Sequence, residues 1–140
     1  MGKFIADEIV KKLINTGKVI KGAKVQIQGL TFKENVRDLR NSKIMDIIKE
    51  LEEFGVKVYA KDPHADIKEI KKEYNIEIDT NPNNEKVDAL VFAVAHDEFK
   101  KYTISDIKSM LKEDSNLVFD IKNMLYKQEM EKNGIDLWRL

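Results

Sequence analysis

The chain has 140 residues, in which 25 Lys and Arg balance 25 Asp and Glu. This length suits a single domain with one core, and the zero formal net charge gives no general attraction to nucleic acid or to a membrane surface, so neither is expected as a partner. No apolar run approaches the ~20 residues that span a bilayer, and no signal-peptide pattern opens the chain.

Cysteine is absent, which excludes disulfides, thiolate metal ligands and cysteine nucleophiles. This absence fits a reducing compartment, and a cytoplasmic protein is expected. The two histidines, His64 and His96, lie far apart in the sequence, so no metal site is expected either.

The first seventeen residues predict a helix from about Lys3 to Thr16. Apolar side chains recur there at intervals of three to five residues, and Gly17 is a typical C-terminal cap. A short polar linker follows. We therefore divide the chain into a helix and linker over residues 1–22 and an α/β domain over residues 23–140.

Five apolar runs rich in Val, Ile, Phe and Tyr predict strands beyond the linker. They are 25–30, 56–60, 76–78, 89–95 and 117–121, and 135–140 is a candidate sixth strand at an edge. Helical periodicity separates them, most clearly from Ile44 to Phe54, where Gly55 ends the pattern. Strands that are apolar on both faces and alternate with helices predict a Rossmann-like, doubly wound parallel sheet of five or six strands. Phe92, Phe119 and Trp138 are expected in its core.

Ligands of such sheets bind at the carboxyl ends of the strands, where successive connections leave for opposite faces. The polar residues just after predicted strands are Lys33 and its neighbours, Asp62, His96, Asp97, Asp120, Lys122 and Asn123. In the dinucleotide-binding strand order the first strand lies beside the fourth, so the loop 29–43 is expected to face His96.

That loop, GLTFKENVRDLRNSK, is unusually long and charged for a connection between a strand and a helix. Its bases are Lys33, Arg37 and Arg40, its acids are Glu34 and Asp38, and a helix is expected to begin near Asn41 or Ser42. The bases and the helix N-terminus together favour a phosphate site, in which the acids hold the arginines through bidentate pairs. The alternative is an ordinary solvated surface loop.

Alternatives also stay open for single residues at the carboxyl ends of the predicted strands. Asp62 either binds a ribose hydroxyl or opens a turn together with Pro63. His96 either contacts a ligand or caps the helix that follows it, and His64 is expected at the surface.

Two common phosphate-binding motifs are missing. A dinucleotide site of the usual kind needs G-x-G-x-x-G after the first strand, and this chain has only Gly29 there. The P-loop motif G-x-x-x-x-G-K-[ST] does not occur either. Any phosphate loop must therefore be of another kind.

The loop 29–43 resembles the signature that opens the C-terminal, UDP-binding domain of the UDP-glucose/GDP-mannose dehydrogenase family. Its Thr-Phe-Lys-Glu-Asn and Asp-Leu-Arg-Asn-Ser are most similar to the branch that oxidises UDP-N-acetylhexosamines such as UDP-N-acetyl-D-mannosamine. The resemblance extends over essentially the whole chain. It includes MGKFIADEIV, YAKDPHA, VFAVAHDEFK, VFDIKN and LWRL.

The resemblance implies that this chain is the substrate-binding part of a larger, oligomeric enzyme. Such enzymes bind NAD in an N-terminal domain and carry a catalytic cysteine in a central helical region, to which residues 1–22 here correspond at its end. They oxidise the sugar CH2OH to a carboxylate, here UDP-N-acetyl-D-mannosamine to UDP-N-acetyl-D-mannosaminuronate. This chain has neither a glycine fingerprint nor a cysteine, so it is expected to bind no cofactor and to be inactive alone. In the alternative interpretation the domain serves mainly assembly with other domains or subunits.

The family's motif also implies roles for individual residues. Phe32 and Lys33 match the Phe-Lys pair placed against the nucleotide and sugar. Lys122 stands nearest to a basic residue that contacts substrate after the fifth strand, although Lys-Asn here replaces Arg-Arg or Thr-Arg. The expected supporting residues are Arg37, Asp38, Arg40, Ser42, Asp62 and His96. Arg37 stands where relatives often have proline, and Asp38 and Arg40 are expected to brace the loop.

Overall fold

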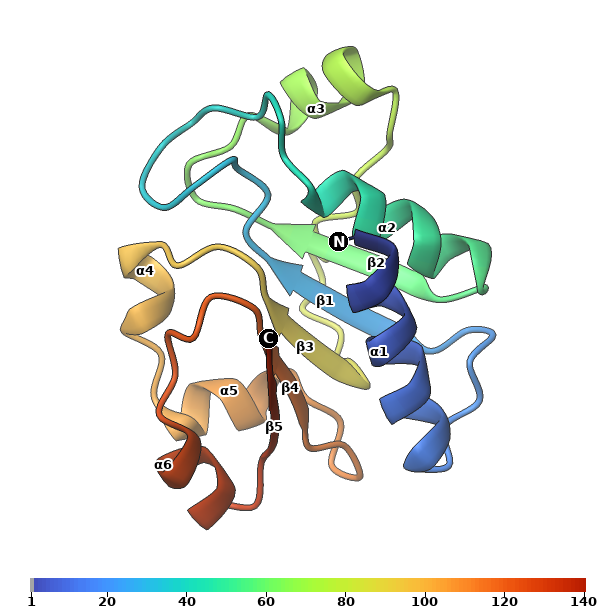
Figure 1. The fold of residues 1–140 in the computed structure, drawn as a ribbon, viewed down its shortest axis with the longest axis vertical. Coiled ribbons are helices and arrows are strands. Elements are labelled where there is room, and N and C mark those ends of the chain that lie inside the picture. Colours follow the sequence, from blue (N-terminus) through green and yellow to red (C-terminus); the bar gives the residue numbers. More distant parts are fainter. Residues whose placement is uncertain (1) are drawn as a thin grey trace.

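The computed structural model describes residues 2–140, which form one parallel sheet with helices on both faces (Figure 1). The strands are β1 (Lys24–Gln28), β2 (Lys57–Lys61), β3 (Ala89–Phe92), β4 (Leu117–Asp120) and β5 (Asp136–Arg139). Their order across the sheet is β2-β1-β3-β4-β5. The predicted Rossmann-like class is confirmed, and the run 89–95 lies beside the first strand as expected.

Six helices cover the sheet in the described part of the chain. They are α1 (Gly2–Asn15), α2 (Ile44–Glu53), α3 (Ile67–Tyr74), α4 (Asp97–Lys100), α5 (Ile104–Met110) and α6 (Lys127–Lys132). One core lies under α1, α2 and α3, and the other lies under α4, α5 and α6. Phe119 is fully buried in the first core and Phe92 in the second, while Trp138 is half-buried. No helix within residues 2–140 is long and apolar enough to cross a membrane.

The N-terminal helix α1 agrees closely with the predicted range. Gly17 follows it with φ of +81°, a conformation that glycine adopts without strain. Ile5, Ile9 and Leu13 are buried in the same core as the β1 residues, so the helix packs directly on the sheet layer. The division of the chain at residue 22 stays a prediction.

The structure corrects two details of the predicted elements. Residues 76–78 form no strand, because Asn75 turns the chain in the left-handed region after α3 and the chain meets β2 only at an isolated bridge between Tyr59 and Asp79. The sheet therefore has five strands, with the 135–140 run supplying the edge strand β5. Phe54, which was expected on the buried stripe of its helix, is 43% exposed because α2 ends at Glu53.

Candidate functional site

The loop 29–43 begins at the reversal point of the sheet. The connection after β1 leads to α2 on one face, whereas the connection after β3 leads to α4 and α5 on the other. Gly29 continues β1 by donating its N–H to the carbonyl of Lys61, and the N–H of Ala93 donates to the carbonyl of Gln28. The loop thus leaves from between β2 and β3, where ligands of doubly wound sheets bind.

Asp62 follows β2, and its fully buried carboxylate joins two segments of backbone. Oδ2 accepts hydrogen bonds from the N–H groups of Leu30 at 2.6 Å and Thr31 at 3.1 Å. Oδ1 accepts from the N–H groups of His64 at 2.7 Å and Ala65 at 3.1 Å. Burial opposes ionisation, but these bonds and the adjacent imidazole outweigh it and hold the pKa of Asp62 below its usual value. This geometry agrees with the alternative in which Asp62 opens a turn, and the same carboxylate also holds the start of the loop 29–43.

His96 follows β3 and is fully buried. Its Nε2 lies 2.9 Å from Oδ2 of Asp62 and 3.2 Å from Oγ1 of Thr31, and its Nδ1 accepts the N–H of Asn35 at 2.9 Å. The residue occupies the N-cap position of α4, yet its side chain makes no capping bond. Its polar contacts are therefore with Asp62 and with the loop, and the predicted juxtaposition of loop 29–43 and His96 is confirmed.

His64 closes this network on its outer side. Its ring lies 4.5 Å from that of His96, and its Nε2 is 3.0 Å from the Glu98 carboxylate. The side chain is 26% exposed, so His64 is half-buried rather than simply a surface residue.

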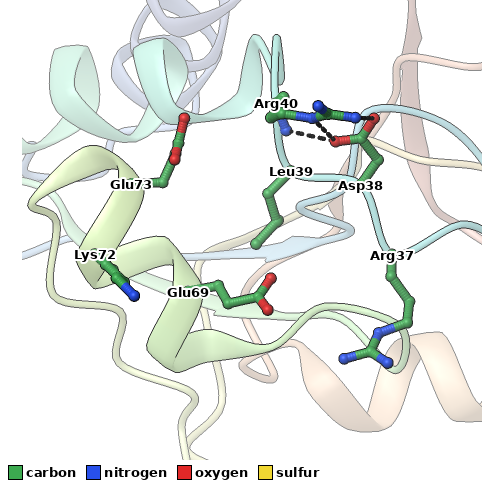
Figure 2. A pocket seen from close by; sticks show the side chains of 7 residues that line it. All are labelled: Arg37, Asp38, Leu39, Arg40, Glu69, Lys72 and Glu73. Atoms are coloured by element: carbon green, nitrogen blue, oxygen red, sulfur yellow. Dashed lines mark hydrogen bonds and ion pairs between the residues drawn. The ribbon is translucent and has the colours of Figure 1, made fainter.

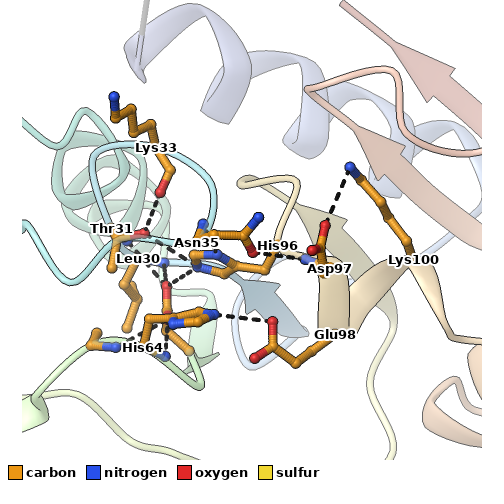
Figure 3. A network of polar contacts seen from close by, with 11 residues as sticks. Leu30, Thr31, Lys33, Asn35, His64, His96, Asp97, Glu98 and Lys100 are labelled. Carbon is orange, nitrogen blue, oxygen red and sulfur yellow. Dashed lines mark hydrogen bonds and ion pairs between the residues drawn. The ribbon is translucent and has the colours of Figure 1, made fainter.

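Phe32 and Lys33 lie between the anchored residues of the loop. Phe32 is 49% exposed, and Lys33 is exposed with its side chain extending away from the network (Figure 3). The backbone around them is fixed, because the N–H of Phe32 donates to the carbonyl of Asp38 at 2.7 Å and the hydroxyl of Thr31 donates to the carbonyl of Lys33 at 2.9 Å. An aromatic ring and an ammonium group are thus presented from a held backbone at the strand end.

Asp38 and Arg40 form one of the bidentate pairs that were predicted for the acids and arginines of this loop (Figure 2). Nε of Arg40 lies 3.1 Å from Oδ1 and Nη2 lies 3.4 Å from Oδ2 of the carboxylate. The hydrogen bonds from the side chain and backbone of Arg40 hold the pKa of Asp38 below its usual value. Glu34, the other acid of the loop, is exposed.

Beside this pair lies a cavity of about 370 Å³ between the loop and α3 (Figure 2). The residues that line it are Arg37, Asp38, Leu39, Arg40, Glu69, Lys72 and Glu73. Three bases and three acids make the cavity electrically balanced, and Lys33 is not part of its lining. The three bases of the loop therefore do not surround one common cavity, and the two arginines face α3.

Ser42 closes the loop on itself and also contacts the start of the helix, because its hydroxyl oxygen accepts the N–H of Ile44 at 3.4 Å. Its buried hydroxyl donates to the carbonyl of Leu30 at 2.8 Å. The helix α2 begins at Ile44, two residues later than the expected start, with Lys43 at the N-cap and no side-chain cap. The helix N-terminus that was expected near residues 41 and 42 therefore lies further along the chain.

Lys122 lies beyond the end of β4 and is exposed. The turn that carries it is held by Asp120, whose buried carboxylate accepts the N–H groups of Met124 at 3.0 Å and Leu125 at 2.8 Å. Asp120 thus holds the turn after β4, and Lys122 on this turn is exposed to solvent.

Sequence reasoning missed Thr31 and Asn35 as parts of the site. Asn35 adopts φ of +60°, and its side-chain oxygen accepts the N–H of Asp97 at 3.1 Å, which ties the loop to the start of α4. Asparagine is one of the few residue types that tolerates the left-handed region, so its place in the middle of a long loop was a usable signal.

The fold, with the loop at the switch point of its sheet, defines a nucleotide-binding class of Rossmann-like domain. The chain belongs to the UDP-glucose/GDP-mannose dehydrogenase family, as its UDP binding domain, because the sequence model of that domain matches residues 26–127.

Similar proteins agree with this assignment. CapL from Staphylococcus aureus is 39% identical over 143 residues, covering 100% of this chain and 32% of CapL. UDP-N-acetyl-D-glucosamine 6-dehydrogenase from Salmonella typhi is 34% identical over 131 residues, covering 94% of this chain and 31% of that enzyme. The chain thus spans about a third of the length of these relatives.

A solved structure has the same fold. NDP-N-acetyl-D-galactosaminuronic acid dehydrogenase from Methanosarcina mazei Go1 superposes with a TM-score of 0.81 at 20% identity. The match covers 98% of this chain and 29% of the other. At this level of identity the likeness supports the fold alone.

Proposed function

We propose that this domain binds the UDP part of a UDP-N-acetylhexosamine, as the substrate-binding portion of an NAD-dependent UDP-sugar 6-dehydrogenase. The observation that carries the proposal is the pair Phe32–Lys33, whose side chains the loop exposes to solvent at the switch point of the sheet. The named relative from Salmonella typhi, which acts on UDP-N-acetyl-D-glucosamine, supports the class of sugar. The resemblance of the loop favours UDP-N-acetyl-D-mannosamine among these sugars.

The chemistry of the exposed groups suits a nucleotide diphosphate. The Lys33 ammonium supplies up to three donors for diphosphate or sugar oxygens, and the Phe32 ring offers an apolar face for the base or sugar. Lys122 adds a second cation from the end of β4. Hydrogen bonds to charged groups contribute about 1.5–3 kcal/mol each, so two or three supply much of the about 8 kcal/mol that micromolar affinity needs.

The redox part of the reaction belongs to other segments of the parent enzyme in this proposal. The chain carries neither a G-x-G-x-x-G motif nor a cysteine, so we assign NAD binding and the nucleophile to the N-terminal and central regions that relatives of three times this length contain. The parent is proposed to be a cytoplasmic homo-oligomer, and this domain alone to be inactive.

Titration calorimetry with UDP-N-acetyl-D-glucosamine tests the proposal. Wild-type protein is expected to bind weakly, and Lys33→Ala is expected to lower the affinity about tenfold or more, because a charge-assisted bond of about 1.5 kcal/mol or more is lost. Lys49→Ala, which removes an exposed lysine from α2, is the matched control and should bind as the wild type does. Equal affinity in both variants would remove Lys33 from the site, and no binding by the wild type would argue against a UDP-sugar site in this chain.

Assembly is the second candidate function, and the exposed apolar side chains of α1 favour it. Phe4 is 51% and Ile14 is 56% exposed on a helix whose other face is buried. Sedimentation with and without UDP separates the two functions. An oligomer that forms equally without UDP, in a protein that binds no UDP, would favour assembly.

A further inference from the structure

We propose that His96 is a positioning residue for the ligand-binding pair Phe32–Lys33, and that it acts as a neutral imidazole with its proton on Nε2. In this role the ring touches no ligand. It fixes the backbone of residues 31–35, from which the two side chains project. The consequence for ligand affinity rests on the proposed function, whereas the positioning itself can be tested without any ligand.

The hydrogen bonds around the ring determine its tautomer. The backbone N–H of Asn35 can only donate, so Nδ1 of His96, at 2.9 Å, must be the acceptor and carries no proton. The ring proton therefore lies on Nε2, which is 2.9 Å from Oδ2 of Asp62. The hydroxyl proton of Thr31 is used on the carbonyl of Lys33, so Oγ1, at 3.2 Å from Nε2, is a second acceptor for the same ring proton. Every polar atom of the ring is thus satisfied in one protonation state only.

The same ring connects the two ends of the segment that presents the ligand-binding pair. Before the pair, the carboxylate of Asp62 holds the N–H groups of Leu30 and Thr31 and receives the Nε2 proton. After the pair, Nδ1 holds the N–H of Asn35. His96 is 0% exposed, so water cannot replace it without a change in packing. Loss of the ring therefore removes the bond to the Asn35 N–H and leaves this end of the segment held by the bond from the Asp97 N–H to the Asn35 side chain, while the other end stays attached to Asp62.

A less ordered loop lowers the affinity for ligand, because a smaller fraction of the molecules holds Phe32 and Lys33 in the position that binds. The apparent dissociation constant equals the intrinsic constant divided by that fraction, so a loop held correctly about a tenth of the time binds about tenfold more weakly. The intrinsic contacts of Phe32 and Lys33 stay unchanged in this account.

Substitution of His96 by glutamine and by alanine tests the role. A carboxamide carries an acceptor oxygen and a donor NH2 in one plane, as the neutral imidazole carries Nδ1 and Nε2–H, so His96→Gln can replace both bonds. His96→Ala can replace neither. Thr103→Ala is the control for simple loss of stability, because it removes the capping box of α5 and none of the bonds of the loop.

Two readouts that need no ligand come first. The 15N signals of the His96 ring in the wild type should show an unprotonated Nδ1 and a protonated Nε2. Hydrogen exchange of the Asn35 amide should accelerate in His96→Ala, return toward the wild-type rate in His96→Gln, and stay unchanged in Thr103→Ala. A proton on Nδ1, or an Asn35 amide that exchanges equally fast in all four proteins, would overturn the proposal.

Calorimetry with UDP-N-acetyl-D-glucosamine then measures the consequence for binding. We expect affinity to fall about tenfold in His96→Ala and to recover most of this loss in His96→Gln, with Thr103→Ala unaffected. Equal losses in the glutamine and alanine variants would show that the residue serves packing alone. If the wild type binds no UDP-sugar, the proposed function fails, while the exchange and 15N results still decide whether His96 positions the loop.

Discussion

Gly29 is the residue at which an added methyl group should be most damaging for the site. It stands at the end of β1 with φ of +107°, a region that other residues adopt only with strain. A Cβ placed there would lie 2.7 Å from Cβ of Val94 and 2.9 Å from its backbone nitrogen. Because a backbone atom is among the contacts, the clash cannot be relieved by a side-chain rotation alone.

Gly17→Ala is the matched control for Gly29→Ala. Gly17 also has a positive φ, +81°, but no atom lies within 4 Å of the added Cβ. Both substitutions incur backbone strain of about 1–3 kcal/mol. Gly29→Ala adds overpacking of about 1–3 kcal/mol, so its total loss is about 2–6 kcal/mol, a large part of the stability of an ordinary domain.

Thermal and urea unfolding of the two variants measure this difference. An excess loss of about 1–3 kcal/mol corresponds to a melting temperature lower by about 3–10 °C in a domain of this size. In Gly29→Ala the Asn35 amide should also exchange faster, because the start of the loop is displaced. Equal destabilisation of the two variants would refute the close-approach argument and leave conformational strain as the sole cause.

Four further substitutions test groups outside the loop. Burial raises the pKa of the Asp88 carboxyl, but a backbone N–H and two lysine ammonium groups outweigh burial and hold this pKa below 3.8. The stabilisation from the ionised carboxylate is therefore present above pH 3.8 and is lost as the pH falls through the lower pKa of the folded state. Asp88→Asn should flatten the acid limb of a curve of stability against pH. The bond to Glu85 and burial raise the pKa of Tyr59 to about 12 from 10.0, so the free energy of unfolding should fall as the pH rises from 10 to about 12. Tyr59→Phe should remove the step at the highest pH from the ultraviolet titration of the phenolates. Oε1 of Gln28 is buried without a partner among residues 2–140, so Gln28→Met should be neutral or stabilising by about 1 kcal/mol in urea unfolding. Gln26→Met should instead destabilise the protein by about 1–3 kcal/mol, because it breaks the buried hydrogen bond between the Gln26 and Asn81 amides.

The order of helices and strands could be predicted because their periodicity reflects burial on the two faces of a parallel sheet. The run 89–95 is apolar at every position, and β3 is buried on both sides. The run 76–78 failed as a strand because three residues after a left-handed asparagine do not have the length to pair along β2. Short apolar runs are ambiguous for this reason.

The position of the loop 29–43 in the fold could also be predicted, but the contacts of its residues could not. The topology alone placed loop 29–43 opposite His96, since the ends of neighbouring parallel strands meet at one edge. The sequence does not reveal that the Asp62 carboxylate accepts four hydrogen bonds from backbone N–H groups, because backbone donors have no residue code. It likewise cannot show that Arg37 and Arg40 line a cavity with α3.

The length of the loop follows from the hydrogen bonds that its backbone already makes. A glycine-rich turn brings backbone N–H groups to a pyrophosphate, whereas here the N–H groups of Leu30 and Thr31 are already bonded to Asp62. A ligand at this strand end must therefore be met by side chains, and those side chains need a backbone that does not move. The bonds from Phe32 to Asp38 and from Ser42 to Leu30 close the loop on itself, which requires about a dozen residues, and the charges between them keep that closed loop hydrated. The length of the loop is thus a consequence of holding two exposed residues, Phe32 and Lys33, in a fixed place.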